Sequence, residues 1–269
     1  MANSMQARHK TASQGSPEAA FVFSDVSRHF RKEGRHLDKG IRAAIHDAFT
    51  RNPCLRAWPA DAIDALCDAG VLRSWQHGEL LFAQNQPCDE IQIILSGSIE
   101  MSTTNAAGLR AVAGYTWPNE VINFIPVIDR KGSMHDQRVH GAATLFHIPG
   151  KALFEQFDNE PGLLRGVLEL VCQRSRNLHA LMSKTALSGF RARLASQLLL
   201  LAQRHGQQTK RGIELVIKLS QEDLAALLMT SRQSVNKELR WLVQQGIVDV
   251  QYSRFTVLDV DKLQKMSAV

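Results

Sequence analysis

The sequence lacks any run approaching the roughly 18 consecutive apolar residues that a membrane-spanning helix requires. Its polar start, MANSMQARHKTASQGSPEAA, also lacks the apolar segment of a secretory signal. Hydrophobic residues make up 44% and charged residues 22% of the chain, so there is enough apolar surface for a core and the chain is not disordered. We therefore expect a cytoplasmic globular protein, and the length of 269 residues favours two domains.

Metal-binding and catalytic spacings are also missing. The four cysteines, Cys54, Cys67, Cys88 and Cys172, match neither a zinc ligand pair nor an iron–sulfur run. We expect reduced thiols, with a site assembled from distant thiolates as the alternative. The cysteine, histidine and carboxylate residues show no nucleophile, metal or phosphate-loop pattern, so the sequence predicts no enzyme and no metal site.

The net charge of +6 is unevenly distributed along the chain. Residues 184–269 carry 13 basic and 7 acidic residues, residues 1–40 carry 7 and 4, and the stretch between them is net acidic. A basic domain beside an acidic one indicates a polyanionic partner for one domain, although a merely solvated surface would show the same charge. Motifs must decide between these two interpretations.

Short β-like runs dominate the first half of the chain. Residues 1–40 show no sustained periodicity, and short helices broken at Pro53 and Pro59 follow. The strands expected between residues 72 and 148 are LRSW, ELLFAQ, EIQIILSG, SIEMSTT, LRAVAGY, EVINFIPVI and ATLFHI, separated by turn residues such as Ser96-Gly97-Ser98. This pattern predicts a small antiparallel sandwich or barrel.

A helical segment follows from residue 162 to about residue 184. Its apolar residues alternate spacings of four and three, which is typical of a coiled-coil seam about three heptads long. The seam residues are Leu164, Leu168, Val171, Leu178 and Met182, with Ser175 at the weakest point. We expect this helix to pair with a copy of itself, the alternative being a helix that packs on its own domain.

The basic end of the chain has the pattern of a winged helix-turn-helix. A helix is predicted for FRARLASQLLLLAQRH, a strand for GIELVIKLS, and two strands around a Tyr252-Ser253 turn for IVDVQYSRFTVLD. Ser220 is expected to cap the first helix of the motif, Ser231 or Thr230 to cap the second, and Gly246 to end it. The inner faces should comprise Leu224, Leu227, Leu228, Val235, Leu239, Leu242 and Val243.

The outward side at the front of the second helix carries Arg232, Gln233, Asn236 and Lys237. These side chains suit a major groove, because arginine and lysine bind guanine edges while asparagine and glutamine pair with adenine. Hydroxyl groups and helix-end amides at Ser220, Ser231 and Ser234 are expected to contact phosphates and set the register. The short turn, the wing and the local positive charge favour double-stranded DNA as partner over an ordinary exposed polar face.

This order of elements resembles the Crp/Fnr family of bacterial transcription regulators over residues 50–260. The stretch LSQEDLAALLMTSRQSVNKELRWLVQQGIV is similar to the family's helix-turn-helix, and LLFAQNQPCDEIQIILSGSIEM to its cyclic-nucleotide-binding roll. By that resemblance Arg232, Gln233 and Lys237 fall on base-reading positions. The expected α+β fold has a mobile basic extension (1–40), an antiparallel β-roll sensory domain with flanking helices (41–160), a dimerisation helix (161–187) and a winged helix-turn-helix DNA-binding domain (188–269).

The expected effector pocket departs from the family pattern. Members that bind cyclic AMP carry Gly-Glu and then Arg-Ser, and their arginine meets the cyclic phosphate. Here Asn123-Phe124 and Met134-His135 stand in these places, with Arg138 as a substitute cation if the alignment shifts. Without the charge-assisted bonds of that arginine we expect an effector other than cyclic AMP.

Two departures concern the DNA site. Met229 stands where many members of the family have a turn glycine, and Gln233 stands where a glutamate is common. The half-site is therefore expected to differ from the best-known one of the family.

The spacing supports no haem or iron–sulfur cofactor. The family's iron–sulfur sensors cluster cysteines near the start of the chain, a spacing that the cysteines here do not reproduce. A haem sensor would need an axial ligand such as His77, His135, His140 or Cys88, and each of these residues also suits an ordinary surface role. The effector therefore stays unidentified at this level.

The sequence thus predicts a homodimeric, sequence-specific transcription regulator controlled by an unidentified effector. Its expected partners are double-stranded DNA, a second copy of the chain and RNA polymerase, with no membrane. A sensor module acting through protein partners is one alternative, and a haem- or redox-sensing regulator is another. The presence of Arg232 and Lys237 argues against the first alternative.

Overall fold

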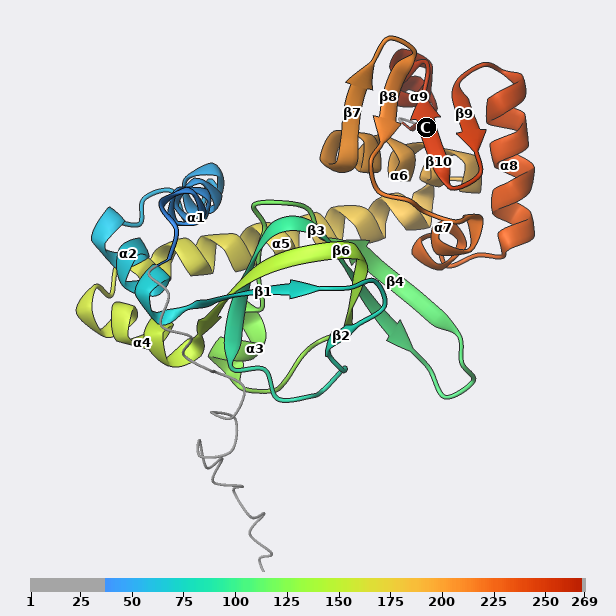
Figure 1. Cartoon of the computed structure of the whole chain (residues 1–269). Coiled ribbons are helices and arrows are strands. Elements are labelled where there is room, and N and C mark those ends of the chain that lie inside the picture. Colours follow the sequence, from blue (N-terminus) through green and yellow to red (C-terminus); the bar gives the residue numbers. More distant parts are fainter. Residues whose placement is uncertain (1–36, 268–269) are drawn as a thin grey trace, which may run out of the picture. The chain divides into compact units, whose positions relative to one another are not determined.

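The structure, a computed structural model, describes residues 37–267, and Figure 1 shows the order of their helices and strands. Most of the extension predicted over residues 1–40 lies outside the described residues. The described part opens with two helices, α1 (Lys39–Arg51) and α2 (Ala60–Ala69). Pro53 and Pro59 both lie in the connection between them, as expected for residues that cannot donate a backbone hydrogen bond within a helix.

A six-stranded antiparallel sheet forms the roll. Its strands are β1 (Val71–Trp75), β2 (Leu80–Phe82), β3 (Glu90–Thr104), β4 (Arg110–Tyr115), β5 (Val121–Ile122) and β6 (Asp136–Pro149). The order across the sheet is β1-β6-β3-β4 (Figure 1). Strand β2 pairs with β6, and β5 pairs with β3. The predicted antiparallel β-domain is therefore confirmed.

The turn predicted at Ser96-Gly97-Ser98 is wrong. These residues lie inside β3, where the pairing with β6 shifts register and forms a bulge. Gly97 has φ +81°, and a Cβ atom there would lie 2.2 Å from the carbonyl oxygen of Ala142. Only glycine fits this bulge, so the turn-like residues bend a continuous strand instead of ending it.

The single strand predicted for EVINFIPVI, residues 120–128, is also wrong, because the observed strand ends at Ile122. Only Val121–Ile122 pairs with β3, and Asn123 then adopts a left-handed backbone with φ +70°. Helix α3 (Phe124–Asp129) begins at the next residue. A short continuous apolar run has no period that separates a strand from a buried helix, which is why the pattern misled.

A long helix connects the roll to the rest of the chain. Helix α4 (Gly150–Asn159) leads into α5 (Leu163–Leu187), which packs Leu163, Val167 and Leu170 against the apolar core of the roll. Four of the predicted seam residues lie on another side of α5 and are exposed: Leu164 (44%), Leu168 (63%), Leu178 (57%) and Met182 (61%). Val171 is half-buried. None of the helices within residues 37–267 has the length and apolar content to cross a membrane.

The C-terminal part is the predicted winged helix-turn-helix. Its elements are α6 (Phe190–His205), β7 (Gly206–Thr209), β8 (Gly212–Leu215), α7 (Gln221–Leu227), α8 (Arg232–Gln244), β9 (Val248–Gln251), β10 (Arg254–Val257) and α9 (Val260–Ser267). The four strands pair antiparallel in the order β7-β8-β10-β9. The sequence pattern did not indicate β7 or α9. The core of this part includes Leu194, Leu198, Leu239 and Phe255.

Candidate nucleic-acid interface and effector cavity

Serine side chains cap both helices of the motif, as predicted. The Ser220 hydroxyl accepts from the Asp223 backbone N–H (3.1 Å), and the Asp223 carboxylate accepts from the Ser220 N–H (2.8 Å), which makes a capping box for α7. The Ser231 hydroxyl accepts from the Ser234 N–H (3.1 Å) and lies 2.9 Å from the Ser234 hydroxyl. These bonds fix where each helix begins.

The inner faces of the two helices are buried as predicted, with one exception. Leu224, Leu228, Val235, Leu239 and Leu242 are each less than 9% exposed, and Leu227 is partly buried. The prediction for Val243 is wrong, because its side chain is 43% exposed. Gly246 has φ +65° directly after the helix end and so fills the predicted C′ position.

The polar face of α8 remains open. Arg232, Gln233 and Lys237 are exposed, whereas Asn236 is half-buried and donates from Nδ2 to Gln221 Oε1 (2.8 Å). Asn236 therefore joins α8 to α7, and a contact with a base would require it to leave this partner. All four predicted base-reading residues border one groove of about 1050 Å³.

Two further cations that the sequence pattern did not indicate border this groove. Arg240 lies further along α8, and Arg191 comes from the start of α6. Together with Arg232 and Lys237 they give four cations against the single carboxylate of Glu238. No local pattern pointed to Arg191, since it is 47 residues from Glu238, its ion-pair partner.

Strand β4 contacts the start of α7 through one arginine. Arg110 Nη2 donates to Asp223 Oδ1 (2.9 Å), and its Nη1 donates to both oxygens of Glu100 (3.0 and 3.1 Å). Burial raises the pKa of Asp223, but the bonds from Ser220 and Arg110 outweigh burial and leave that pKa below its usual value. The N-terminal end of α7 is thus held by a charged residue of the roll.

A cavity of about 730 Å³ lies against α3, the start of β6 and α5. Three residues of the predicted effector pocket, Asn123, Met134 and His135, line it. The other two predicted residues do not line this cavity. Phe124 is fully buried in the apolar core, and Arg138 donates from Nη1 to the carbonyl oxygen of Gly78 (2.8 Å) outside the cavity.

A chain of buried side-chain hydrogen bonds runs from this cavity into the roll. Gln137 and Asn123 exchange amide hydrogen bonds (2.7 and 3.0 Å), Asn123 also donates to Gln92, and Gln92 donates to Glu90 (2.9 Å). Glu90 accepts from His147 (2.7 Å). Burial raises the pKa of Glu90, but its bonds to His147 and Gln92 leave that pKa lowered overall. The network joins β3, β6 and the residue that precedes α3, so it could not be found from sequence spacing.

The cavity wall also carries a carboxylate with little hydrogen bonding. Burial raises the pKa of Glu120 to about 7, and its Oε2 has no hydrogen-bond partner in the described part of the chain. Its Oε1 lies 3.7 Å from Arg174 Nη2 of α5. The guanidinium of Arg204 stacks 3.7 Å from the ring centroid of Trp117 in the same wall.

The residues considered as haem ligands are engaged elsewhere. His77 Nδ1 accepts from Gly141 N–H (3.0 Å), His140 Nε2 lies 2.7 Å from the Lys218 carbonyl oxygen, and His135 Nδ1 lies 3.3 Å from the Thr103 hydroxyl. Burial raises the pKa of the Cys88 thiol to about 12. The four cysteines are free, in agreement with the predicted reduced thiols.

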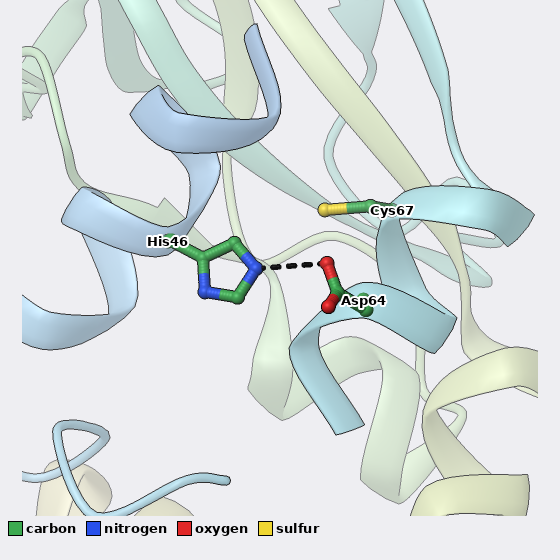
Figure 2. A group of neighbouring side chains, drawn as sticks. All are labelled: His46, Asp64 and Cys67. Carbon is green, nitrogen blue, oxygen red and sulfur yellow. Dashed lines mark hydrogen bonds and ion pairs between the residues drawn. The ribbon is translucent and has the colours of Figure 1, made fainter. Parts of the chain in front are cut away.

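A separate cluster joins α1 to α2, and Figure 2 shows its members His46, Asp64 and Cys67. Their ligand-type atoms lie within 4.8 Å of one another. Asp64 Oδ1 already accepts from Arg42 Nη1 (2.7 Å) and lies 3.0 Å from His46 Nε2. Burial raises the pKa of the Cys67 thiol to about 11, which disfavours the thiolate, the form of cysteine that binds metals. The ion pair between Arg42 of α1 and Asp64 of α2 connects the two helices at this cluster.

Comparison with known proteins agrees with the architecture. Residues 72–160 match the cyclic nucleotide-binding domain family, and residues 192–266 match the Crp-like helix-turn-helix domain family. The CRP-like cAMP-activated global transcriptional regulator of Mycobacterium tuberculosis (strain ATCC 25618 / H37Rv) is 24% identical over 193 residues, which are 70% of this chain and 84% of that protein.

Two solved structures share the fold. FixK2 from Bradyrhizobium japonicum has a TM-score of 0.66 and 14% identity, with 74% of this chain and 98% of that chain covered. The c-di-GMP responsive global regulator CLP of Xanthomonas campestris has a TM-score of 0.63 and 18% identity, with coverage of 74% and 99%. The predicted order of roll, long helix and helix-turn-helix is therefore confirmed.

Proposed function

We propose that this chain, a Crp-type transcriptional regulator by both of its domains, binds sequence-specific DNA sites as a homodimer under the control of an effector other than cyclic AMP. Arg232, Gln233 and Lys237 contact base edges in this proposal. The amides at the start of α8, around Ser231 and Ser234, contact phosphate. The Ser220 hydroxyl serves as a helix cap instead, because it is bonded to Asp223. The cytoplasmic location and the contact with RNA polymerase remain predictions.

The open polar face of α8 carries this proposal. One side of the helix is buried through Val235, Leu239 and Leu242, so the opposite side is the one available to a partner. Arg232 and Lys237 stand there one and six residues after the Ser231 cap, at the end that enters the major groove in helix-turn-helix proteins. Within residues 37–267 these exposed cations have no carboxylate partner, which suits a polyanion better than a protein core.

Helix α5 supports the homodimer. Its seam residues Leu168 and Leu178 are more than half exposed, while another side of the same helix is packed on the roll. A second copy of α5 would cover this apolar strip and present two α8 helices to one duplex. Two-fold symmetry places the half-sites one helical turn, about 34–36 Å, apart.

The buried amide network supports an effector without a cyclic phosphate. The Nδ2 and Oδ1 atoms of Asn123 are bonded to Gln92 and Gln137, so they offer no free donor to a phosphate group. Phe124 contributes to the core rather than to the cavity. Cyclic AMP at millimolar concentration is therefore expected to leave the melting temperature unchanged. A ligand that binds only the folded protein stabilises it by about 2.7 kcal/mol at 100 times its dissociation constant. A saturable rise in melting temperature with cyclic AMP would therefore contradict the proposal that the effector is not cyclic AMP.

Selection from a random pool of DNA duplexes tests the DNA-binding proposal. The wild-type chain should enrich a near-palindromic motif with half-sites centred about one helical turn apart. Arg232→Ala should remove the preference at one base pair in each half-site and cost about 1–3 kcal/mol per half-site, because it deletes a bidentate contact to guanine. Arg165→Ala serves as the control, since Arg165 is an exposed arginine near the N-terminal end of α5 and is paired with a carboxylate.

Two outcomes would contradict the proposal. If the wild type enriches no two-fold motif, sequence-specific binding as a dimer is wrong. If Arg232→Ala selects the same motif as the wild type, Arg232 does not contact a base, and the roles of Gln233 and Lys237 lose their support as well.

A further inference from the structure

Arg191 stands out among the cations of the α8 groove, because other side chains already fix its position. Its Nε donates to Glu238 Oε2 at 2.6 Å, and its guanidinium carbon lies 3.8 Å from the ring centroid of Trp241. Glu238 and Trp241 both belong to α8, whereas Arg191 is the second residue of α6. The side chain of Arg191 is still 45% exposed, compared with 15% for Glu238.

The unused part of the guanidinium decides what Arg191 can do. Its Nε is bonded to Glu238 and one of its faces lies on the indole ring of Trp241, so the two terminal nitrogens are left for the groove. Two parallel N–H donors on a planar fork match two oxygens of a phosphate group. An arginine already held in place loses less side-chain entropy when it binds than a free one does.

We propose that Arg191 is a preorganised phosphate-binding residue of the DNA interface, with Glu238 and Trp241 as the positioning residues that hold its guanidinium. This inference rests on the proposed DNA binding and adds a contact from outside the helix-turn-helix. Arg191 binds the sugar-phosphate backbone beside the groove that α8 enters. It therefore fixes the register of α8 on the duplex without selecting a base.

The salt dependence of binding tests this proposal without knowledge of the target site. The probe is a random-sequence duplex of about 30 base pairs, which is three helical turns. Each phosphate contact contributes about 0.9 to the slope of log affinity against log salt, so Arg191→Ala should reduce the slope of a dimer by about 1.8. Affinity at low salt should fall on the order of tenfold per protomer. Arg165→Ala on α5 controls for the change in net charge and should leave the slope unchanged.

A charge-cancelling double variant separates a phosphate contact from simple neutralisation. If Arg191 acts only by masking the carboxylate of Glu238, the variant Arg191→Ala/Glu238→Gln should recover both the wild-type slope and the wild-type affinity. A phosphate-binding Arg191 predicts that the double variant keeps the reduced slope. Recovery of the slope overturns the proposal.

Arg191→Lys tests the positioning residues. Lysine keeps the positive charge but has no planar fork to stack on Trp241 and bond to Glu238, so the slope should stay close to that of the wild type while affinity falls several-fold. Full affinity with lysine overturns the positioning role. Thermal melting of each variant shows whether the fold is intact.

The failure of this inference can be told from the failure of the proposed function. A wild type with a flat salt dependence overturns both. A wild type with a steep slope that Arg191→Ala leaves unchanged overturns only the role of Arg191.

Discussion

The roll and the helix-turn-helix treat their polar side chains in opposite ways. In the roll, Gln92, Asn123 and Gln137 are buried and bonded to one another. On α8, Arg232 and Lys237 are exposed and form no hydrogen bond or ion pair within residues 37–267. Paired polar groups specify the fold and lose stability when one partner is removed, whereas unpaired exposed groups contribute little to stability and are available to a ligand.

The largest expected effect concerns exposed apolar side chains, namely the seam residues of α5 such as Leu168 and Leu178. Leu168→Glu combined with Leu178→Glu should place like charges across paired helices and give monomers. DNA affinity should then fall about a hundredfold or more, because the two half-sites are no longer bound by one linked molecule. Sedimentation and a DNA titration measure the two effects.

Leu109→Glu is the matched control, since Leu109 is 71% exposed but lies in the β3–β4 loop. It should leave both the oligomeric state and DNA affinity unchanged. A wild type that sediments as a monomer at micromolar concentration would show that the strip has another role.

The next largest effect should come from breaking the network inside the roll. Gln92→Leu removes a donor to Glu90 and an acceptor for Asn123 at a fully buried position, so the free energy of unfolding should fall by about 2–4 kcal/mol. Gln173→Leu alters an exposed glutamine of α5 and should change the free energy of unfolding by less than about 0.5 kcal/mol. Urea denaturation measures both, and equal effects would remove the contrast between paired and exposed groups.

The smallest effect concerns the turn between α7 and α8. Met229 has φ +48° and is 76% exposed, so glycine would relieve a left-handed backbone without loss of packing. Glycine also makes the unfolded chain more flexible, and the net gain in stability from Met229→Gly should be about 0.5 kcal/mol. Met134→Gly, at a half-exposed position without positive φ, should instead lower stability slightly. A loss of stability in Met229→Gly would mean that Met229 makes contacts that compensate its strain.

The helix-turn-helix was the most predictable part of the molecule from sequence. Its caps at Ser220 and Ser231 and its ending at Gly246 depend on bonds between residues at most three apart in sequence, or on the backbone of one residue. The apolar period placed the inner face correctly up to Val243, where the helix is in its last turn and no longer covered. Local rules suffice where the determining contacts are local.

The roll was less predictable because its decisive contacts join distant residues. The bulge at Gly97 depends on the close approach of Ala142 from β6, and the change from strand to helix depends on the left-handed backbone of Asn123. The residues that line the cavity were only partly predicted. The family resemblance implied that Phe124 lies beside a ligand, whereas its side chain is buried in the apolar core. Arg191 escaped prediction for the same reason, as both of its partners lie on another helix.

The contact between Arg110 and Asp223 limits how this protein can be divided. Arg110 bonds to the capping box of α7, and the apolar residues Val112 and Tyr115 of β4 belong to the core of the C-terminal part. A fragment that starts at residue 188 would expose that core and lose one of the charges that hold Asp223. An exchange of sensor domains would therefore have to keep this part of β4 together with the helix-turn-helix. The two functional modules cannot be separated by cutting the chain at a single position.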